Sequence, residues 1–243
     1  MTAAKSYQKP YQQIPIRDCG EPLVPIPPEQ FILASPHPYQ KLGAPYDKSA
    51  ANSPYHVRRD VCDRLIQANQ YLQSQHPNLK ILVFDAYRPV EVQQFMVDYA
   101  FSERLRSAGL TVENLSEDRQ NELWREVYQF WAVPSPDPAT PPPHSTGAAV
   151  DITLFDLAGS ALNMGSPIDE ISPRSHPDYF VDSADKIEVQ YHHNRQLLKR
   201  VMTAAGFHQH PKEWWHFSHG DQMWAWLQNG RNVRGAIARY GRY

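Results

Sequence analysis

The sequence predicts an α+β fold, a single domain with a small central antiparallel sheet flanked by helices. Two short segments have strand character: 80–85 contains a short apolar run typical of a buried strand, and 149–155 alternates at period two. Four longer segments have helical patterns. Helices and strands are mixed along the chain without regular strand–helix–strand alternation, which favours α+β over a parallel α/β sheet.

The four helices are expected at 57–75, 90–108, 116–131 and 185–205. In the first helix, apolar residues from Val61 to Leu72 recur at helical spacing. Pro89 precedes the second helix, and Ser116 is a typical N-cap for the third. Gly206 follows the fourth, where a glycine commonly ends a helix.

The strands are expected to place polar side chains at one face. Residues 80–85 form a short buried strand, and the turn residues 156–159 suggest that 149–155 begins a hairpin. Alternation separates Asp151 from Val150 and Ile152, so its carboxylate should point away from the aliphatic layer into a cleft. A final strand or strand pair is expected within 207–219.

Prolines concentrate in the first part of the chain. Residues 1–54 show no sustained periodicity and are expected to form an arm that packs on the domain formed by 55–243. Its tyrosines and its short apolar stretch favour packing over a free tail.

Composition excludes some classes of protein. The net charge of −2 gives no basic surface for nucleic acid. The longest strongly apolar run, 81–84, is far too short to span a membrane. No secretory signal is visible, and the two cysteines suggest a reduced pair, so the protein is expected to be cytoplasmic.

Three residues in two segments could hold a metal ion. His144 and Asp151 lie close together in the chain, and His216 follows much later. Two imidazoles and one carboxylate leave a fourth position open for water, as in catalytic zinc sites. The same ligand set could hold iron or manganese. Taken separately, each segment could also be a solvated loop or a buried polar residue.

Glu213 precedes His216 by three residues and could accept a proton from that water. Residues three apart share a face of a helix but point oppositely on a strand. Because the tryptophan-rich segment after Glu213 has strand character, Glu213 is expected just before the strand, where the chain still turns after Pro211.

Arg88 is expected at the end of the 80–85 strand, where clefts form. A fixed guanidinium there could stabilise the oxyanion that develops when water attacks a carbonyl group. A structural ion pair is the simpler alternative for this residue alone.

Taken in order, these segments resemble the D-alanyl-D-alanine dipeptidases. The shared patterns are Asp85-x-Tyr-Arg-Pro, His144-x6-Asp151 and Glu213-x-x-His216, and the segment around Asp169 resembles this branch in particular. The family belongs to the zinc D,D-peptidases, which include D,D-carboxypeptidases and hedgehog-like domains. The resemblance covers roughly residues 55 to 220.

The resemblance implies one zinc ion per chain, held by His144, Asp151 and His216, with Glu213 as catalytic base and Arg88 at the transition state. It places Asp169 near the substrate's ammonium group and Tyr87 in contact with the substrate. In one departure, Pro142 stands where the family usually has a serine, whose hydroxyl could help to bind the substrate.

The function expected from this resemblance is hydrolysis of the D-Ala-D-Ala dipeptide to two D-alanines in peptidoglycan precursor turnover. The partner would be a small dipeptide, with no nucleic acid and no membrane, and homo-oligomers are possible. Two alternatives stay open: a D,D-carboxypeptidase that trims longer stem peptides, and a non-catalytic zinc-binding domain. Glu213 and Arg88 argue against the second, since holding a metal requires neither.

Overall fold

A computed structural model describes residues 9–46 and 53–243, so parts of the 1–54 segment lie outside it. A central sheet has the strand order β2-β4-β5-β8-β7, with β6 beside β5. Its strands are β2 (Ile32–Leu33), β4 (Leu79–Asp85), β5 (Ala149–Asp156), β6 (Ser160–Ala161), β7 (His208–Gln209) and β8 (His216–Ser218). The predicted hairpin at 149–161 and the final strand pair are therefore confirmed.

The sheet is antiparallel, as predicted, except at one edge. β2 pairs with β4 in parallel, with Ile32 opposite Leu82. A strand of two residues is too short for alternation to be recognised, so the sequence did not reveal this addition from the N-terminal segment.

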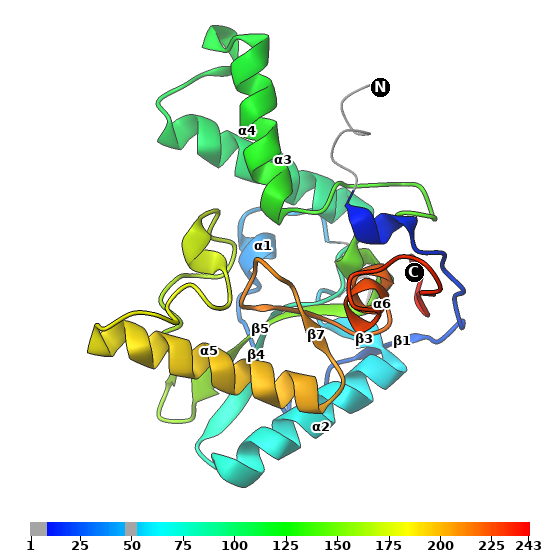
Figure 1. Cartoon of the computed structure of the whole chain (residues 1–243), viewed down its shortest axis with the longest axis vertical. Helices are drawn as coiled ribbons and strands as arrows, with labels where there is room; N and C mark the ends of the chain where they lie inside the picture. The colour runs from blue at the N-terminus through cyan, green and yellow to red at the C-terminus, as the bar shows by residue number, and fades with distance from the viewer. Residues whose placement is uncertain (1–8, 47–52) are drawn as a thin grey trace.

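Two helices cover one face of the sheet. They are α2 (Arg59–Gln75) and α5 (Lys186–Ala204), which lie together below the sheet in Figure 1. Leu65 and Leu198 from these helices are fully buried against Val150 and Ile152 of β5. Burying each such side chain contributes roughly 1.5–3 kcal/mol. This apolar face therefore fixes which side of β5 is left for polar groups.

A helical hairpin projects from the opposite face (Figure 1). It consists of α3 (Val90–Ser107) and α4 (Glu117–Phe130), with the short 3-10 helix η4 (Val112–Asn114) between them. Ser116 caps α4, as predicted, by accepting the N–H of Arg119 at 3.3 Å. Phe101 and Trp124 stack between the helices with ring centroids 4.0 Å apart. At its base the hairpin packs on α1 (Pro38–Lys41).

The described part of the N-terminal segment packs against the C-terminal part of the chain. The 3-10 helix η2 (Pro10–Gln13) lies against α6 (Gln222–Gln228), and Tyr11 and Met223 share an apolar cluster. β1 (Leu23–Pro25) pairs with β3 (His56–Arg58), the residues directly before α2. Two further 3-10 helices are η5 (Pro143–Thr146) and η6 (Pro173–Ser175).

Cys19 is exposed and Cys62 is buried, and both are free thiols. None of the helices in residues 9–46 and 53–243 combines the length and the apolar character needed to cross a membrane.

Candidate metal centre and active site

The site is built on one row of side chains that crosses three strands. Asp85 of β4 lies opposite Asp151 of β5, and Asp151 lies opposite His216 of β8. Directly opposed residues point to the same face of a sheet, so the register brings together residues that are far apart in the chain.

A bulge turns Asp85 onto this face. Val83 pairs with Ile152, but Asp85 pairs with Asp151, so β4 has one extra residue at this point. Regular alternation would have directed Asp85 to the same face as the buried Val83. The bulge instead aims the carboxylate at the site, a role that bulges often have beside active sites.

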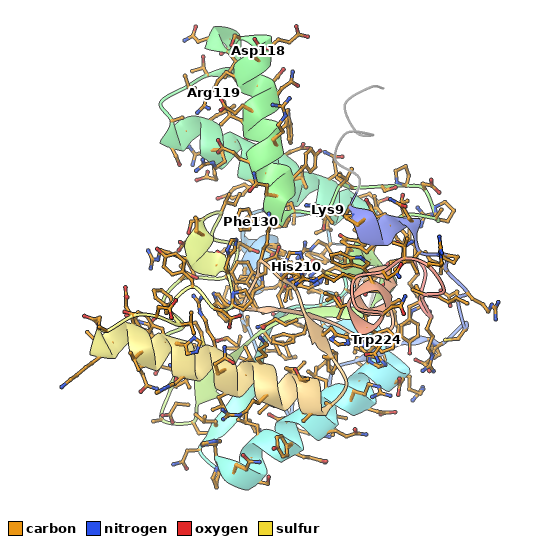
Figure 2. The ribbon with its side chains drawn as sticks, in the orientation of Figure 1. Lys9, Asp118, Arg119, Phe130, His210 and Trp224 are labelled. Atoms are coloured by element: carbon orange, nitrogen blue, oxygen red, sulfur yellow. The ribbon has the colours of Figure 1, made fainter. Side chains whose placement is uncertain are left out.

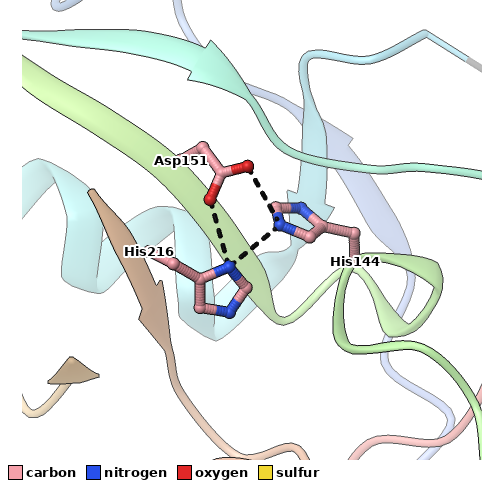
Figure 3. A group of neighbouring side chains, drawn as sticks. All are labelled: His144, Asp151 and His216. Atoms are coloured by element: carbon pink, nitrogen blue, oxygen red, sulfur yellow. Dashed lines mark hydrogen bonds and ion pairs between the residues drawn. The ribbon is translucent and has the colours of Figure 1, made fainter. Parts of the chain in front are cut away.

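His144, Asp151 and His216 form a compact group of metal-binding atoms (Figure 3). His144 Nε2 lies 3.1 Å from His216 Nδ1 and 3.2 Å from Asp151 Oδ2. His216 Nδ1 lies 3.1 Å from Asp151 Oδ1. All three side chains are buried. The structure thus brings together the three residues that the sequence predicted as ligands.

These atoms fit a tetrahedral metal ion. Zinc bonds of about 2.0–2.1 Å separate neighbouring ligand atoms by about 3.3 Å, close to the separations found here. His144 Nδ1 donates a hydrogen bond to the Ala86 carbonyl oxygen at 2.6 Å, which leaves Nε2 with a free lone pair. Burial would raise the pKa of Asp151, but His144 and His216 outweigh it and lower that pKa, so the carboxylate is ionised.

The loop that carries His144 depends on Gly147. Gly147 has a φ of 71°, and its N–H donates to the His144 carbonyl oxygen at 3.1 Å. A Cβ atom at this position would lie 2.3 Å from Leu23 Cδ2. The glycine therefore permits both the left-handed turn and the close approach of β1.

We expect Gly147→Ala to lower the free energy of unfolding by the cost of a left-handed alanine, about 1–2 kcal/mol. The clash with Leu23 adds ~1–3 kcal/mol. Gly109→Ala is the matched control, since its φ is 65° and nothing lies within 4 Å of the added Cβ. Urea unfolding of both variants measures the difference, and equal losses would contradict a steric role for Gly147.

Arg88 is buried beside Asp85 and Asp151, two members of the row of side chains that crosses the sheet. Its Nε and Nη2 donate to Asp85 Oδ2 at 3.0 and 2.6 Å, and Nη1 donates to Gln93 at 2.9 Å. Nη2 also lies 3.3 Å from Asp151 Oδ2. The guanidinium packs over the rings of Tyr39 and Trp131. Its orientation is fixed, as expected for a group that stabilises developing negative charge.

Asp85 holds Arg88 in place, a role that the sequence analysis did not assign to it. Its Oδ1 accepts hydrogen bonds from Tyr46 at 2.9 Å and from His37 at 3.0 Å, while Oδ2 accepts from Arg88. Burial would raise the pKa of Asp85, but Arg88 and His37 outweigh it and lower the pKa. His37 and Tyr46 lie in the proline-rich segment, where no pattern indicated a part in the site.

Glu213 lies before β8 in the turn after Pro211, as expected. Its Oε2 is 3.8 Å from His216 Nδ1, and it is buried. Its Oε1 has no hydrogen-bond partner within the described residues. His210 Nδ1, 3.5 Å away, already accepts the N–H of Lys212. Burial, Asp151 and Asp169 raise the pKa of Glu213 well above its usual value.

Asp169 faces the same pocket, and Tyr87 does not. Asp169 has a φ of 67°, and its Oδ2 accepts a hydrogen bond from Tyr39 at 2.8 Å. Burial and the Asp151 carboxylate raise the pKa of Asp169 to about 7. Tyr87 lies outside the residues that line the pocket, and its hydroxyl donates to the carbonyl oxygen of Tyr243 at 3.5 Å.

The pocket also contains residues that sequence reasoning missed. They come from η2, from the end of α4 and from the turn before β8, and include Lys9, Tyr11, Phe130, Trp131 and His210. Figure 2 labels Lys9, Phe130 and His210 near the centre of the molecule. The other predicted residues, His144, Asp151, Glu213, His216, Arg88 and Asp169, all line the pocket.

Comparison with known families gives one match along most of the chain. A family described as D-Ala-D-Ala dipeptidase matches residues 34–232. A Synechocystis protein named D-alanyl-D-alanine dipeptidase is 50% identical over 241 residues, which cover 96% of each chain. An Escherichia coli protein of the same name is 30% identical over 148 residues, covering 59% of this chain and 57% of its own.

Among solved structures, the chain is similar to a mutant of the vancomycin resistance D,D-pentapeptidase VanY in complex with Zn(II). The TM-score is 0.45 at 15% identity, covering 91% of this chain and 94% of that one.

Proposed function

Because this chain belongs to the D-Ala-D-Ala dipeptidase family, we propose that it hydrolyses the D-Ala-D-Ala dipeptide to two D-alanines with one zinc ion per chain. The observation that carries the proposal is the buried Glu213 carboxylate, whose Oε1 has no hydrogen-bond partner among the described residues and which lies in the same pocket as the three proposed metal ligands. Holding a metal ion requires no such group, so its presence favours catalysis over a purely structural site.

When bound, zinc acts as a Lewis acid and lowers the pKa of its water toward ~7. Glu213 would take a proton from the attacking water and deliver it to the leaving amine. Arg88, held by Asp85, offers a fixed positive charge to the carbonyl oxygen as negative charge develops there.

Asp169 is proposed to receive the ammonium group of the dipeptide. The carboxylate lies in the pocket, and Tyr39 fixes its orientation through a hydrogen bond of 2.8 Å. A bound ammonium would favour the ionised form of Asp169 over the protonated form that burial favours. Recognition of this free amine would limit the enzyme to short peptides.

We further propose that the reaction takes place in the cytoplasm as part of peptidoglycan precursor turnover. Tyr87 is also proposed to contact the substrate, and it would do so through Tyr243. The hydroxyl of Tyr87 donates a hydrogen bond to the carbonyl oxygen of Tyr243.

Purified, zinc-loaded protein is expected to release D-alanine from D-Ala-D-Ala, and a chelator is expected to reduce the rate by at least ~100-fold, since the Lewis acid is lost. Adding zinc back should restore the rate, and a D-alanine assay measures each state. No release from the zinc-loaded protein would contradict the proposal. Efficient cleavage of a pentapeptide stem would contradict the role of Asp169 and favour a D,D-carboxypeptidase.

A further inference from the structure

The pocket lining contains one arginine and one lysine, Arg88 and Lys9. The guanidinium of Arg88 already donates to Asp85, Gln93, Asp151 and Tyr39. Most of its donors are therefore engaged with protein groups. Lys9 is the other cation to which an anionic part of a ligand could bind.

The backbone at Lys9 is firmly held. Its N–H donates to Gln12 Oε1 at 2.7 Å, and its carbonyl oxygen accepts the N–H of Gln12 at 3.0 Å. Gln222 of α6 donates to the carbonyl oxygens of Gln12 and Ile14 at 3.3 and 2.7 Å. Tyr11 is buried beside Met223. Lys9 thus extends from a packed turn.

The ammonium of Lys9 reaches the end of α4, where main-chain carbonyls attract cations. Its Nζ donates to the carbonyl oxygens of Tyr128 at 2.5 Å and Gln129 at 3.4 Å. A lysine ammonium has three N–H donors. Among residues 9–46 and 53–243 these two carbonyls are its acceptors, which leaves one N–H without an acceptor in this part of the chain.

Lys9 and Glu213 line the same pocket. Burial lowers the pKa of Lys9, and the Glu213 carboxylate partly offsets this effect. The lining of this pocket thus contains an acid, Asp169, and a lysine, Lys9, together with Glu213.

We infer that Lys9 is a specificity-determining residue that binds the free carboxylate of the dipeptide through its remaining N–H. This inference rests on the proposed function. The substrate is a zwitterion, so Asp169 would bind its ammonium end and Lys9 its carboxylate end. A peptide extended at either end would lose one of these contacts, and both contacts together select a free dipeptide.

Lys9→Met removes one charge-assisted hydrogen bond to the substrate. The KM for D-Ala-D-Ala is therefore expected to rise by about 10- to 100-fold, with kcat little changed. For D-Ala-D-alaninamide, which lacks the carboxylate, the two proteins should have the same kinetics. Lys9→Arg should retain most of the affinity. An unchanged KM, or an equal loss with both substrates, would overturn the inference and leave Lys9 as a support for α4.

Lys212→Met is the control for net charge, since Lys212 is exposed and lies outside the pocket lining. Its KM should not change, and a change equal to that of Lys9→Met would overturn the inference. Thermal melting of the variants shows whether α4 has been weakened.

A binding experiment separates this inference from the proposed function. Calorimetry measures the Kd of D-Ala-D-Ala for zinc-loaded Glu213→Gln, with and without Lys9→Met. Equal Kd values, or no binding to either protein, would overturn the role of Lys9. If the unmodified protein does not hydrolyse the dipeptide but Lys9→Met weakens binding at least tenfold, the proposed function fails and the role of Lys9 stands.

Discussion

Replacing Glu213 by glutamine is expected to reduce kcat for D-Ala-D-Ala by about 10²–10⁴-fold, the usual contribution of a general acid–base group. Glutamine has nearly the same shape but cannot accept the proton of the attacking water. The three metal-binding side chains do not include Glu213, so metal content should be unchanged. Steady-state kinetics and elemental analysis on the same preparation measure the two quantities.

Glu91→Gln is a suitable control, because Glu91 is exposed at the start of α3 and outside the pocket lining. It should keep full activity. Full activity in Glu213→Gln would remove Glu213 from the mechanism. Loss of metal together with activity would instead identify Glu213 as part of the metal site.

Asp85→Ala is expected to lower the free energy of unfolding by about 3–5 kcal/mol, because it leaves the guanidinium of Arg88 buried without its main partner. His37 and Tyr46 lose their acceptor as well. Activity should fall even where the protein stays folded, since Arg88 would no longer be fixed. Urea unfolding and kcat at low temperature measure the two effects.

Asp98→Ala removes an exposed carboxylate from α3 and should leave both stability and activity nearly unchanged. If Asp85→Ala behaved like this control, the buried network would have no part in positioning Arg88.

The sequence predicted most of the secondary structure, because the elements are long and regular. Apolar spacing located α2 and α5, and the serine and glycine signals located the ends of α4 and α5 within one or two residues. Of the two-residue strands β2 and β6, the sequence predicted only one. The turn residues at 156–159 predicted a hairpin and hence β6, whereas nothing in the local pattern around Ile32 indicated a parallel edge strand.

The candidate metal ligands could be selected from the sequence because ligand chemistry restricts the residue types, and the structure brings His144, Asp151 and His216 together. The rest of the site depends on tertiary contacts. Lys9 and Tyr39 enter the site from an irregular segment whose path no periodicity specifies. The bulge that redirects Asp85 reverses what alternation alone would suggest.

The pairing of β5 with β8 extends over only three residue pairs, from Ala149 opposite Ser218 to Asp151 opposite His216. An ion held between the last of these pairs would bridge two strands whose hydrogen bonds are few. Because it would bind only the correctly paired strands, its affinity would add directly to their stability. If β5 slipped by one residue, Asp151 would face the helices and Val150 would face the pocket, so metal binding and apolar packing would be lost together. Metal binding and the apolar packing of β5 thus depend on the same strand register.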